Sequence, residues 1–252
     1  RARRLQAEHQ ISQAFGDCEI KCRSRLSYRP GDTIVHSEAR LRADELALQW
    51  ERHLSKTAGV PLDIDLSYNW RQLGRQQEHL LSTAIRRPSG EVTGVVLIAP
   101  DATGESGHAV QFATSAHIND ISDWLAISPH LMQKLGHRRP TGDVSVAMHA
   151  LSVDDWHSGR LAIDATRVDY DAENIRGFHK PAGLPATAEI AWHGEKRTDM
   201  PGQRWTLDEG RLHFGDLAID RLTGEIATGP LSLDALDLTT FADAIQARLE
   251  AS

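Results

Sequence analysis

The segment VPLDIDLSYNW, residues 60–70, constrains the fold of this chain more than any other, because its side chains alternate strictly in character. The apolar residues occupy every second position: Leu62, Ile64, Leu66, Tyr68 and Trp70. The positions between them are Asp63, Asp65, Ser67 and Asn69. Successive side chains of a β-strand point to opposite faces of a sheet. The segment is therefore predicted to be a strand with one buried and one wet face.

The same alternation recurs along most of the chain. It is found in residues 18–28, 92–99, 143–153, 159–170 and 186–194. Turn-forming residues separate these segments, at 30–32, 88–91, 102–107, 140–143 and 200–203. The pattern predicts a mainly β chain of roughly ten to fourteen strands, joined as an antiparallel meander.

Three segments show helical spacing instead. Residues 119–136 follow a possible N-cap at Asn119 or Asp120, residues 239–250 place apolar side chains on one stripe, and residues 1–15 form a third possible helix. Residues 41–56 fit a strand or a helix equally well. The predicted fold is a long curled antiparallel sheet, open as a groove or half-barrel, with two or three short flanking α-helices.

The bulk composition limits the class of protein. The net charge of −7 has mixed signs along the chain, so no continuous basic surface for nucleic acid is expected. No apolar run approaches the ~18 residues that a membrane-spanning helix needs. The chain begins on Arg1 and ends just after a predicted helix. We therefore expect a single β-rich segment, 1–252, of a longer protein, with repeat-like sub-units at 1–85, 86–140 and 141–252.

Named catalytic signatures are missing from the sequence. It contains no GxSxG, GxGxxG, GxxxxGK[ST] or HExxH, and no two histidines are spaced as a metal pair. Asp63 and Asp65 lie on the polar phase of a regular strand, which favours a solvated face over a metal site. Cys18 and Cys22 are expected to be buried structural thiols, too far apart along a strand to bridge each other. No catalytic residue, metal or cofactor is predicted.

Short phrases repeat within the chain. Gly159–Asp164 (GRLAID) returns as Gly215–Asp220 (GDLAID), and residues 117–135 resemble residues 231–249. Asp164 and Asp220 are each predicted to end a strand. The alternation changes phase at Gly215, which predicts a turn or bulge there.

The apolar phases of these strands are the best candidates for function, because few helices are available to cover so many one-sided strands. A long sheet of this kind can close around a packed core, or curl around an apolar ligand such as lipid acyl chains. The predicted groove-lining residues are Val95, Leu97, Val144, Val146, Leu161, Ile163, Leu212, Phe214, Leu217, Ile219, Leu231 and Leu233.

The repeated units resemble the periplasmic β-rich part of AsmA-like proteins, and within them the YhdP type. The resemblance covers about residues 85–252. It rests on INDISDWLAISPHLMQKLGHRRPTGDVSV (118–146), W-x-x-G-R-L-A-I-D (156–164), IRGFHKPAGLPATAEIAWHG (175–194) and LSLDALDLTTFADAIQARL (231–249).

The resemblance implies a cell-envelope protein of Gram-negative bacteria. Such proteins are anchored in the inner membrane by an N-terminal helix, which would lie outside this chain, and extend a curled sheet with an apolar lining across the periplasm. They are implicated in moving phospholipids towards the outer membrane, without known catalytic residues. The implied partner is thus a phospholipid or another acyl-chain lipid.

Two alternatives from other classes stay open at the level of sequence. A carboxylate-based glycan hydrolase would need two carboxylates facing each other across a cleft, such as Asp154 and Asp220. A non-catalytic envelope assembly module would bind a partner strand along a free sheet edge.

Overall fold

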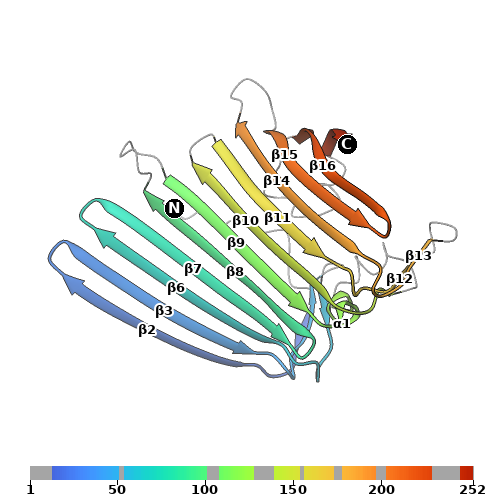
Figure 1. The fold of residues 1–252 in the computed structure, drawn as a ribbon. Coiled ribbons are helices and arrows are strands. Elements are labelled where there is room, and N and C mark those ends of the chain that lie inside the picture. Colours follow the sequence, from blue (N-terminus) through green and yellow to red (C-terminus); the bar gives the residue numbers. More distant parts are fainter. Residues whose placement is uncertain are drawn as a thin grey trace.

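The computed structural model describes residues 13–50, 54–100, 108–127, 139–153, 156–172, 178–196, 203–228 and 245–251. Within these ranges the chain forms seventeen strands, β1 to β17, and one short helix, α1 (Figure 1). The prediction of a mainly β, antiparallel chain is confirmed.

One 12-stranded sheet dominates the structure, in the order β17-β16-β15-β14-β11-β10-β9-β8-β7-β6-β3-β2. Its strands are β2 (Glu19–Arg29), β3 (Asp32–Arg42), β6 (Asp63–Leu73), β7 (Gln76–Arg87), β8 (Gly90–Pro100), β9 (His108–Ile118), β10 (Val144–Val153), β11 (Trp156–Asp164), β14 (Ala186–Lys196), β15 (Gln203–Phe214), β16 (Leu217–Thr228) and β17 (Ile245–Ala251). Every neighbouring pair is antiparallel, and the sheet is open, with β2 and β17 at opposite ends of the order.

The smaller elements belong to three longer connections at one end of the strands. The β3–β6 connection holds β4 (Ala47–Trp50) and β5 (Leu54–Lys56), which join β1 (Gln13–Phe15) in a three-stranded sheet. The β9–β10 connection holds α1 (Ile121–Leu125), and the β11–β14 connection holds the pair β12 (Tyr170–Ala172) and β13 (Phe178–Lys180). In an antiparallel sheet β3, β9 and β11 run in the same direction, so all three connections leave from the same end (Figure 1).

A buried arginine holds α1 against the end of the sheet. The Arg87 side chain is 2 % exposed and lies 2.8 Å from the Asp123 carboxylate. Its guanidinium also donates to the Asp123 carbonyl oxygen at 2.6 Å and lies 5.9 Å from the ring centroid of Trp124. Asp120 caps the helix by accepting from the Ser122 N–H at 3.0 Å.

In the part of the chain that the structure describes, the large sheet is a single layer with little conventional core. Among the described residues the buried hydrophobic side chains are Ala43, Val144, Val168, Leu207 and Leu222. The accessible surface is 17381 Å², against roughly 11,000 Å² for a compact monomer of this mass. Apart from hydrogen-bonded strand neighbours, no two described elements make more than isolated contacts. Among the described residues, most side chains of both faces are therefore contacted mainly by their neighbours within the sheet.

Two segments predicted as helices contain strands. Residues 245–251 form β17, because Ile245, Ala247, Leu249 and Ala251 also fit a period of two. Residues 13–15 of the predicted N-terminal helix form β1. The third predicted helix, 119–136, contains α1 at 121–125, and its residues 128–136 lie outside the described ranges.

Of the other local predictions, the turn at Gly215 and the end of a strand at Asp164 are confirmed, and those for Asp220 and the two cysteines are wrong. Gly215, at φ 58°, and Asp216 form the predicted turn between β15 and β16, and β11 ends at Asp164 as expected. Asp220 does not end a strand, because β16 continues to Thr228 while pairing with β15. Cys18 and Cys22 are exposed rather than buried, since β2 forms an edge of the sheet and is covered by no second layer of described residues.

The unit β2–β3–β6 is duplicated as β10–β11–β14. In the first copy Cys22 pairs with Ala39 and Ala39 with Leu66. In the second copy Met148 pairs with Leu161 and Leu161 with Ile190. Gly16 and Gly142, each just before the first strand of its copy, make equivalent close approaches to the backbone at Glu45–Leu46 and Arg167–Val168.

The connections within the two copies are also equivalent, because each is held by a buried lysine. Lys56 and Lys180 are 4 % and 5 % exposed. Lys56 Nζ donates to the carbonyl oxygens of Asp44, Leu46 and Thr57 at 3.1, 2.7 and 3.3 Å, and Lys180 Nζ donates to those of Thr166, Val168 and Pro181 at 3.1, 2.6 and 3.4 Å. Burial lowers the pKa of both ammonium groups. The repeated phrases SKTAGVP (55–61) and HKPAGLP (179–185) are the sequence signal of this duplication.

Candidate binding faces of the sheet

The strand register places an unbroken row of apolar residues across eleven strands. Residues paired directly across antiparallel strands lie on the same face of a sheet. From β2 to β16 the row is Ile20, Leu41, Ile64, Ile85, Val92, Ala116, Val146, Ile163, Ala188, Leu212 and Ile219. At about 4.8 Å per strand, the apolar row is roughly 48 Å long.

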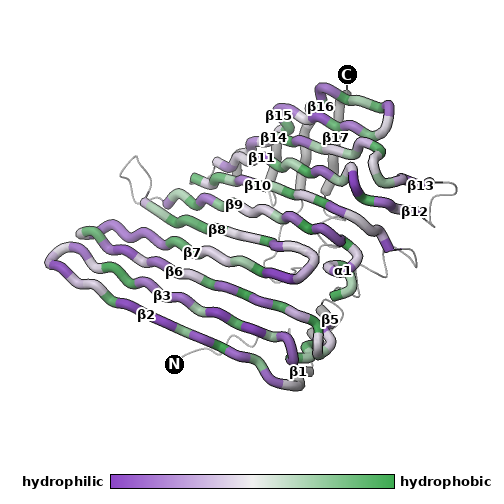
Figure 2. Tube along the Cα trace, turned by 60° about the horizontal axis from the view of Figure 1, so that its bottom comes forward, coloured by the Kyte–Doolittle hydropathy of each residue, from purple (hydrophilic) through white to green (hydrophobic). Residues whose placement is uncertain are grey.

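Further apolar residues flank this row on the same face, which we call the apolar face. They include Leu26, Tyr28, Leu66, Tyr68, Trp70, Leu81, Val96, Phe112, Met148, Leu161, Ile190, Trp192, Phe214 and Leu217. The opposite, polar face carries most of the charged side chains, and Figure 2 shows the resulting alternation along the strands.

Eight of the predicted lining residues lie on the apolar face: Val144, Val146, Leu161, Ile163, Leu212, Phe214, Leu217 and Ile219. Leu231 and Leu233 lie outside the described ranges. The register therefore brings together predicted residues from β10, β11, β15 and β16.

Val95 and Leu97 lie on the opposite face from the other eight predicted lining residues. Val95 pairs with Ser82 and Ala113, which puts it on the polar face, and Leu97 lies on the same side. The prediction did not separate the two faces here, because the segment VTGVVLIA carries apolar residues at both its odd and its even positions. The even-numbered residues of this segment, such as Val92 and Val96, lie on the apolar face.

The prediction also missed the N-terminal half of the row. Ile20, Leu41, Ile64 and Ile85 extend the apolar row across β2, β3, β6 and β7. The alternation in residues 60–70 was a sufficient signal for Ile64, but the prediction relied on the phrases that repeat in the C-terminal half.

Exposure of the apolar face is greatest at the two ends of the row. Ile20, Leu26 and Tyr28 on β2 are 63, 68 and 73 % exposed, and Leu217 on β16 is 62 % exposed. The corresponding residues of the central strands, such as Val146 and Ile163, are half-buried. The face is thus continuous and accessible, with its best-shielded part in the middle of the sheet.

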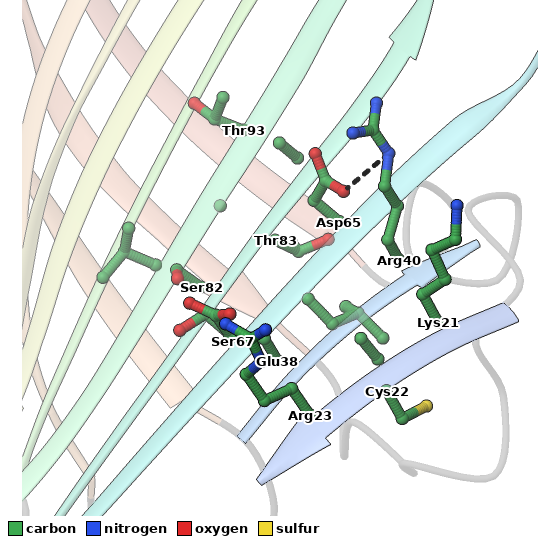
Figure 3. A pocket seen from close by; sticks show the side chains of 15 residues that line it. Lys21, Cys22, Arg23, Glu38, Arg40, Asp65, Ser67, Ser82, Thr83 and Thr93 are labelled. Carbon is green, nitrogen blue, oxygen red and sulfur yellow. Dashed lines mark ion pairs between the residues drawn. The ribbon is translucent and has the colours of Figure 1, made fainter. Parts of the chain in front are cut away.

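A hollow of about 680 Å³ crosses β2, β3, β6, β7 and β8 (Figure 3). Its lining consists of three consecutive residues from each strand: 21–23, 38–40, 65–67, 82–84 and 93–95. The outer two of each triplet belong to the polar face. The middle residue of each triplet belongs to the apolar face. The next apolar-face residues on the same strands, such as Tyr68 after Leu66 and Ile85 after Thr83, do not line the hollow. The hollow therefore opens on the polar face.

Charges within this hollow largely neutralise one another. Arg40 Nε lies 3.5 Å from the Asp65 carboxylate (Figure 3). Arg86 also pairs with Asp65. Arg40 and Arg42 contact Asp63 at 3.9 and 3.5 Å. Asp63 and Asp65 thus belong to a surface network of ion pairs, in agreement with their predicted place on the wet face of a strand. Such a network gives the hollow no strong preference for an anion or a cation.

Most described carboxylates of the C-terminal half are exposed, whereas Asp143, Asp169 and Asp171 are half-buried. Asp164, Asp208, Asp216 and Asp220 are all exposed, and Asp154 lies outside the described ranges. The described side chains include no group of three or more His, Cys, Asp or Glu residues that could hold a metal ion. The hydrolase alternative therefore gains no support from the carboxylates that the structure describes.

No protein-family model, curated protein or solved structure matches this chain. In the described ranges, no helix has both the length and the apolar character needed to cross a membrane.

Proposed function

We propose that this chain is a segment of a lipid-transfer protein and that its apolar face binds the acyl chains of phospholipids. The observation that carries the proposal is the apolar row, which crosses eleven strands without a polar residue and has no helix or second sheet of described residues packed over it. Large exposed apolar surfaces on proteins commonly serve as binding sites.

The energetics suit a bound acyl chain. Each CH₂ group removed from water contributes about 0.8 kcal/mol, so a chain of about 16 carbons gains about 13 kcal/mol when it is fully covered. An open sheet contacts roughly one side of the chain, which reduces the gain to about 6 kcal/mol. That is enough to hold a chain, while its charged head group remains in water. The gain is shared among many residues, so binding would tolerate different lipids.

The wider setting is proposed from the resemblance to AsmA-like proteins of the YhdP type. In that setting the protein lies in the periplasm and reaches the inner membrane through a segment outside this chain. The apolar row would then form part of a path for phospholipid between the inner and outer membranes. The length of the row and the exposure of apolar residues at its two ends, Ile20 and Leu217, support this proposal, because a path must admit a lipid at one end and release it at the other.

The test compares substitutions at neighbouring positions on the two faces. Ile85 and Ile163 belong to the apolar row, whereas Ala84 and Ala162 precede them on the same strands and lie on the polar face. The double variant Ile85→Glu/Ile163→Glu puts two carboxylates into the row. The matched control Ala84→Glu/Ala162→Glu adds the same charges to the opposite face.

Native mass spectrometry of each protein, after incubation with phosphatidylethanolamine and phosphatidylglycerol vesicles, gives the amount of lipid bound per chain. We expect the wild type and the control to carry lipid, and the apolar-row variant to carry several-fold less. Circular dichroism verifies that all three remain β-structured. A wild type without lipid, or equal losses in both variants, would refute the proposal.

A further inference from the structure

The outer edge of β2 has the properties of a strand-pairing site. β2 is eleven residues long and stands at the end of the strand order. All of its residues are exposed, and among the described residues no strand pairs with its outer edge. A long edge strand presents a row of unpaired N–H and C=O groups, which is a template for another strand.

The internal duplication shows what kind of neighbour fits this edge. β10 occupies in the second copy the place that β2 occupies in the first. Its outer edge is covered by β9, which pairs with it antiparallel from Val144↔Ile118 to Val153↔Ala109. In that arrangement Met148, the counterpart of Cys22, pairs with Thr114. The equivalent position beside β2 therefore accepts an antiparallel strand of about the same length.

The side chains of β2 specify the chemistry of that strand. Its polar face carries Lys21, Arg23, Arg25 and Arg29. Lys21 pairs with Glu19 at 2.8 Å, while Arg23 and Arg29 form no ion pair in the part of the chain that the structure describes. Opposite charges across a strand pair stabilise it, and like charges destabilise it. The polar face of the incoming strand should therefore be acidic.

The other face of β2 selects for apolar residues. Ile20, Leu26 and Tyr28 continue the apolar face to the edge of the sheet. A second copy of β2 would be a poor partner, because antiparallel self-pairing centred on Ser24 would place Arg23 of one copy opposite Arg25 of the other. An acidic, alternating segment avoids this repulsion.

We propose that the β2 edge binds an extended polypeptide segment, antiparallel to β2, in which acidic residues alternate with aliphatic ones. The partner adds a thirteenth strand to the large sheet. Its acids face Lys21, Arg23, Arg25 and Arg29, and its aliphatic residues extend the apolar face. This inference rests on the edge alone and does not depend on lipid binding.

The experiment uses the full chain and three fluorescein-labelled probes of eleven residues. One peptide alternates Glu with Val or Thr, and a second replaces every Glu with Lys. The third is the Glu peptide with N-methyl groups in place of the N–H groups that would pair with β2. Fluorescence anisotropy measures binding. We expect the Glu peptide to bind at least tenfold more tightly than the Lys peptide, and the N-methylated peptide to bind at least tenfold more weakly than the Glu peptide.

A charge-reversed variant, Arg23→Glu/Arg25→Glu, completes the design. It should reverse the preference and bind the Lys peptide more tightly, which a folding defect could not produce. Slower amide exchange in Glu19–Arg29 on adding the Glu peptide would place the contact at β2. Failure of the Glu peptide to bind, equal binding of both charge types, or unchanged binding of the N-methylated peptide would overturn the proposal. A chain that dimerises through β2 in analytical ultracentrifugation would also overturn it, in favour of a second copy.

Discussion

Replacing Lys56 by methionine keeps most of the aliphatic stem and removes the ammonium group that joins three backbone carbonyls. The two shorter contacts, to Leu46 O at 2.7 Å and Asp44 O at 3.1 Å, carry most of the interaction, and the third is 3.3 Å long. Leaving a buried acceptor without a partner costs about 1–3 kcal/mol. Asp44 O keeps the Gly59 N–H as a donor, so the loss falls mainly on Leu46 O and gives a destabilisation of about 1–3 kcal/mol. The same reasoning applies to Lys180.

The duplication supplies a control within the same molecule. The Gly59 N–H donates to Asp44 O at 2.9 Å in one connection, and the Gly183 N–H donates to Thr166 O at 2.8 Å in the other. A local loss of about 1–3 kcal/mol should accelerate amide exchange about 5- to 160-fold at the affected site. We expect Lys56→Met to accelerate exchange at Gly59 and leave Gly183 unchanged, and Lys180→Met to do the reverse.

Hydrogen exchange followed by NMR measures both amides in each variant. Lys21→Met is the surface control, because the Lys21 side chain is 68 % exposed and a surface ion pair contributes little. Exchange rates at Gly59 that stay within about twofold of the wild type in Lys56→Met would refute the role assigned to the buried lysines. Acceleration at both glycines in each single variant would show that the two connections open together. That result would contradict the prediction that each lysine stabilises only its own connection.

Two further predictions concern the two faces of the sheet. In Gly159→Ala, the new Cβ would lie 2.2 Å from the Trp192 ring, so urea unfolding should show a loss of about 1–3 kcal/mol; an unchanged midpoint would contradict this close approach. On the polar face, hydrogen bonds to Asn69 and Glu38 raise the pKa of His36 above its ordinary value of 6.5. The stabilisation from charged His36 is then fully present below pH 6.5 and is lost as the pH rises through the raised pKa. NMR titration should place its midpoint above 6.5 and lower in Asn69→Ala, and a wild-type midpoint at or below 6.5 would contradict the prediction.

The sheet itself could be predicted from the sequence, because a period of two is a local property of each strand. Residues 60–70 sufficed to assign the faces of β6, and the Gly215–Asp216 turn followed from a change of phase. The failures lie where one segment fits two patterns. Val95 and Leu97 belong to a strand that is apolar on both phases, and residues 245–251 satisfy a helical stripe and a strand alternation equally. In such segments the pairing with a neighbouring strand decides, and pairing cannot be read from the segment alone.

The site raises a different difficulty. The alternation gives the composition of each strand but not the register between strands, and register determines whether apolar positions form one continuous row. Ile20 and Ile219 lie far apart in the sequence and belong to one row only because every intervening pair is in phase. The buried lysines were missed for a related reason. A lysine in a polar connection is ordinarily solvated, and only the repetition of SKTAGVP as HKPAGLP indicates that two of them have the same structural role.

The direction of the apolar row connects the two proposals. The row runs across the strands, so an acyl chain moving along it would pass from strand to strand towards the edges of the sheet. A strand added at β2 does not cover the apolar face. The added strand lies in the plane of the sheet and lengthens the apolar row by about 4.8 Å at its β2 end, where Ile20 is exposed. Edge pairing would therefore extend a lipid path beyond β2, and a partner that presents aliphatic residues on one face and acids on the other would continue both faces of the sheet.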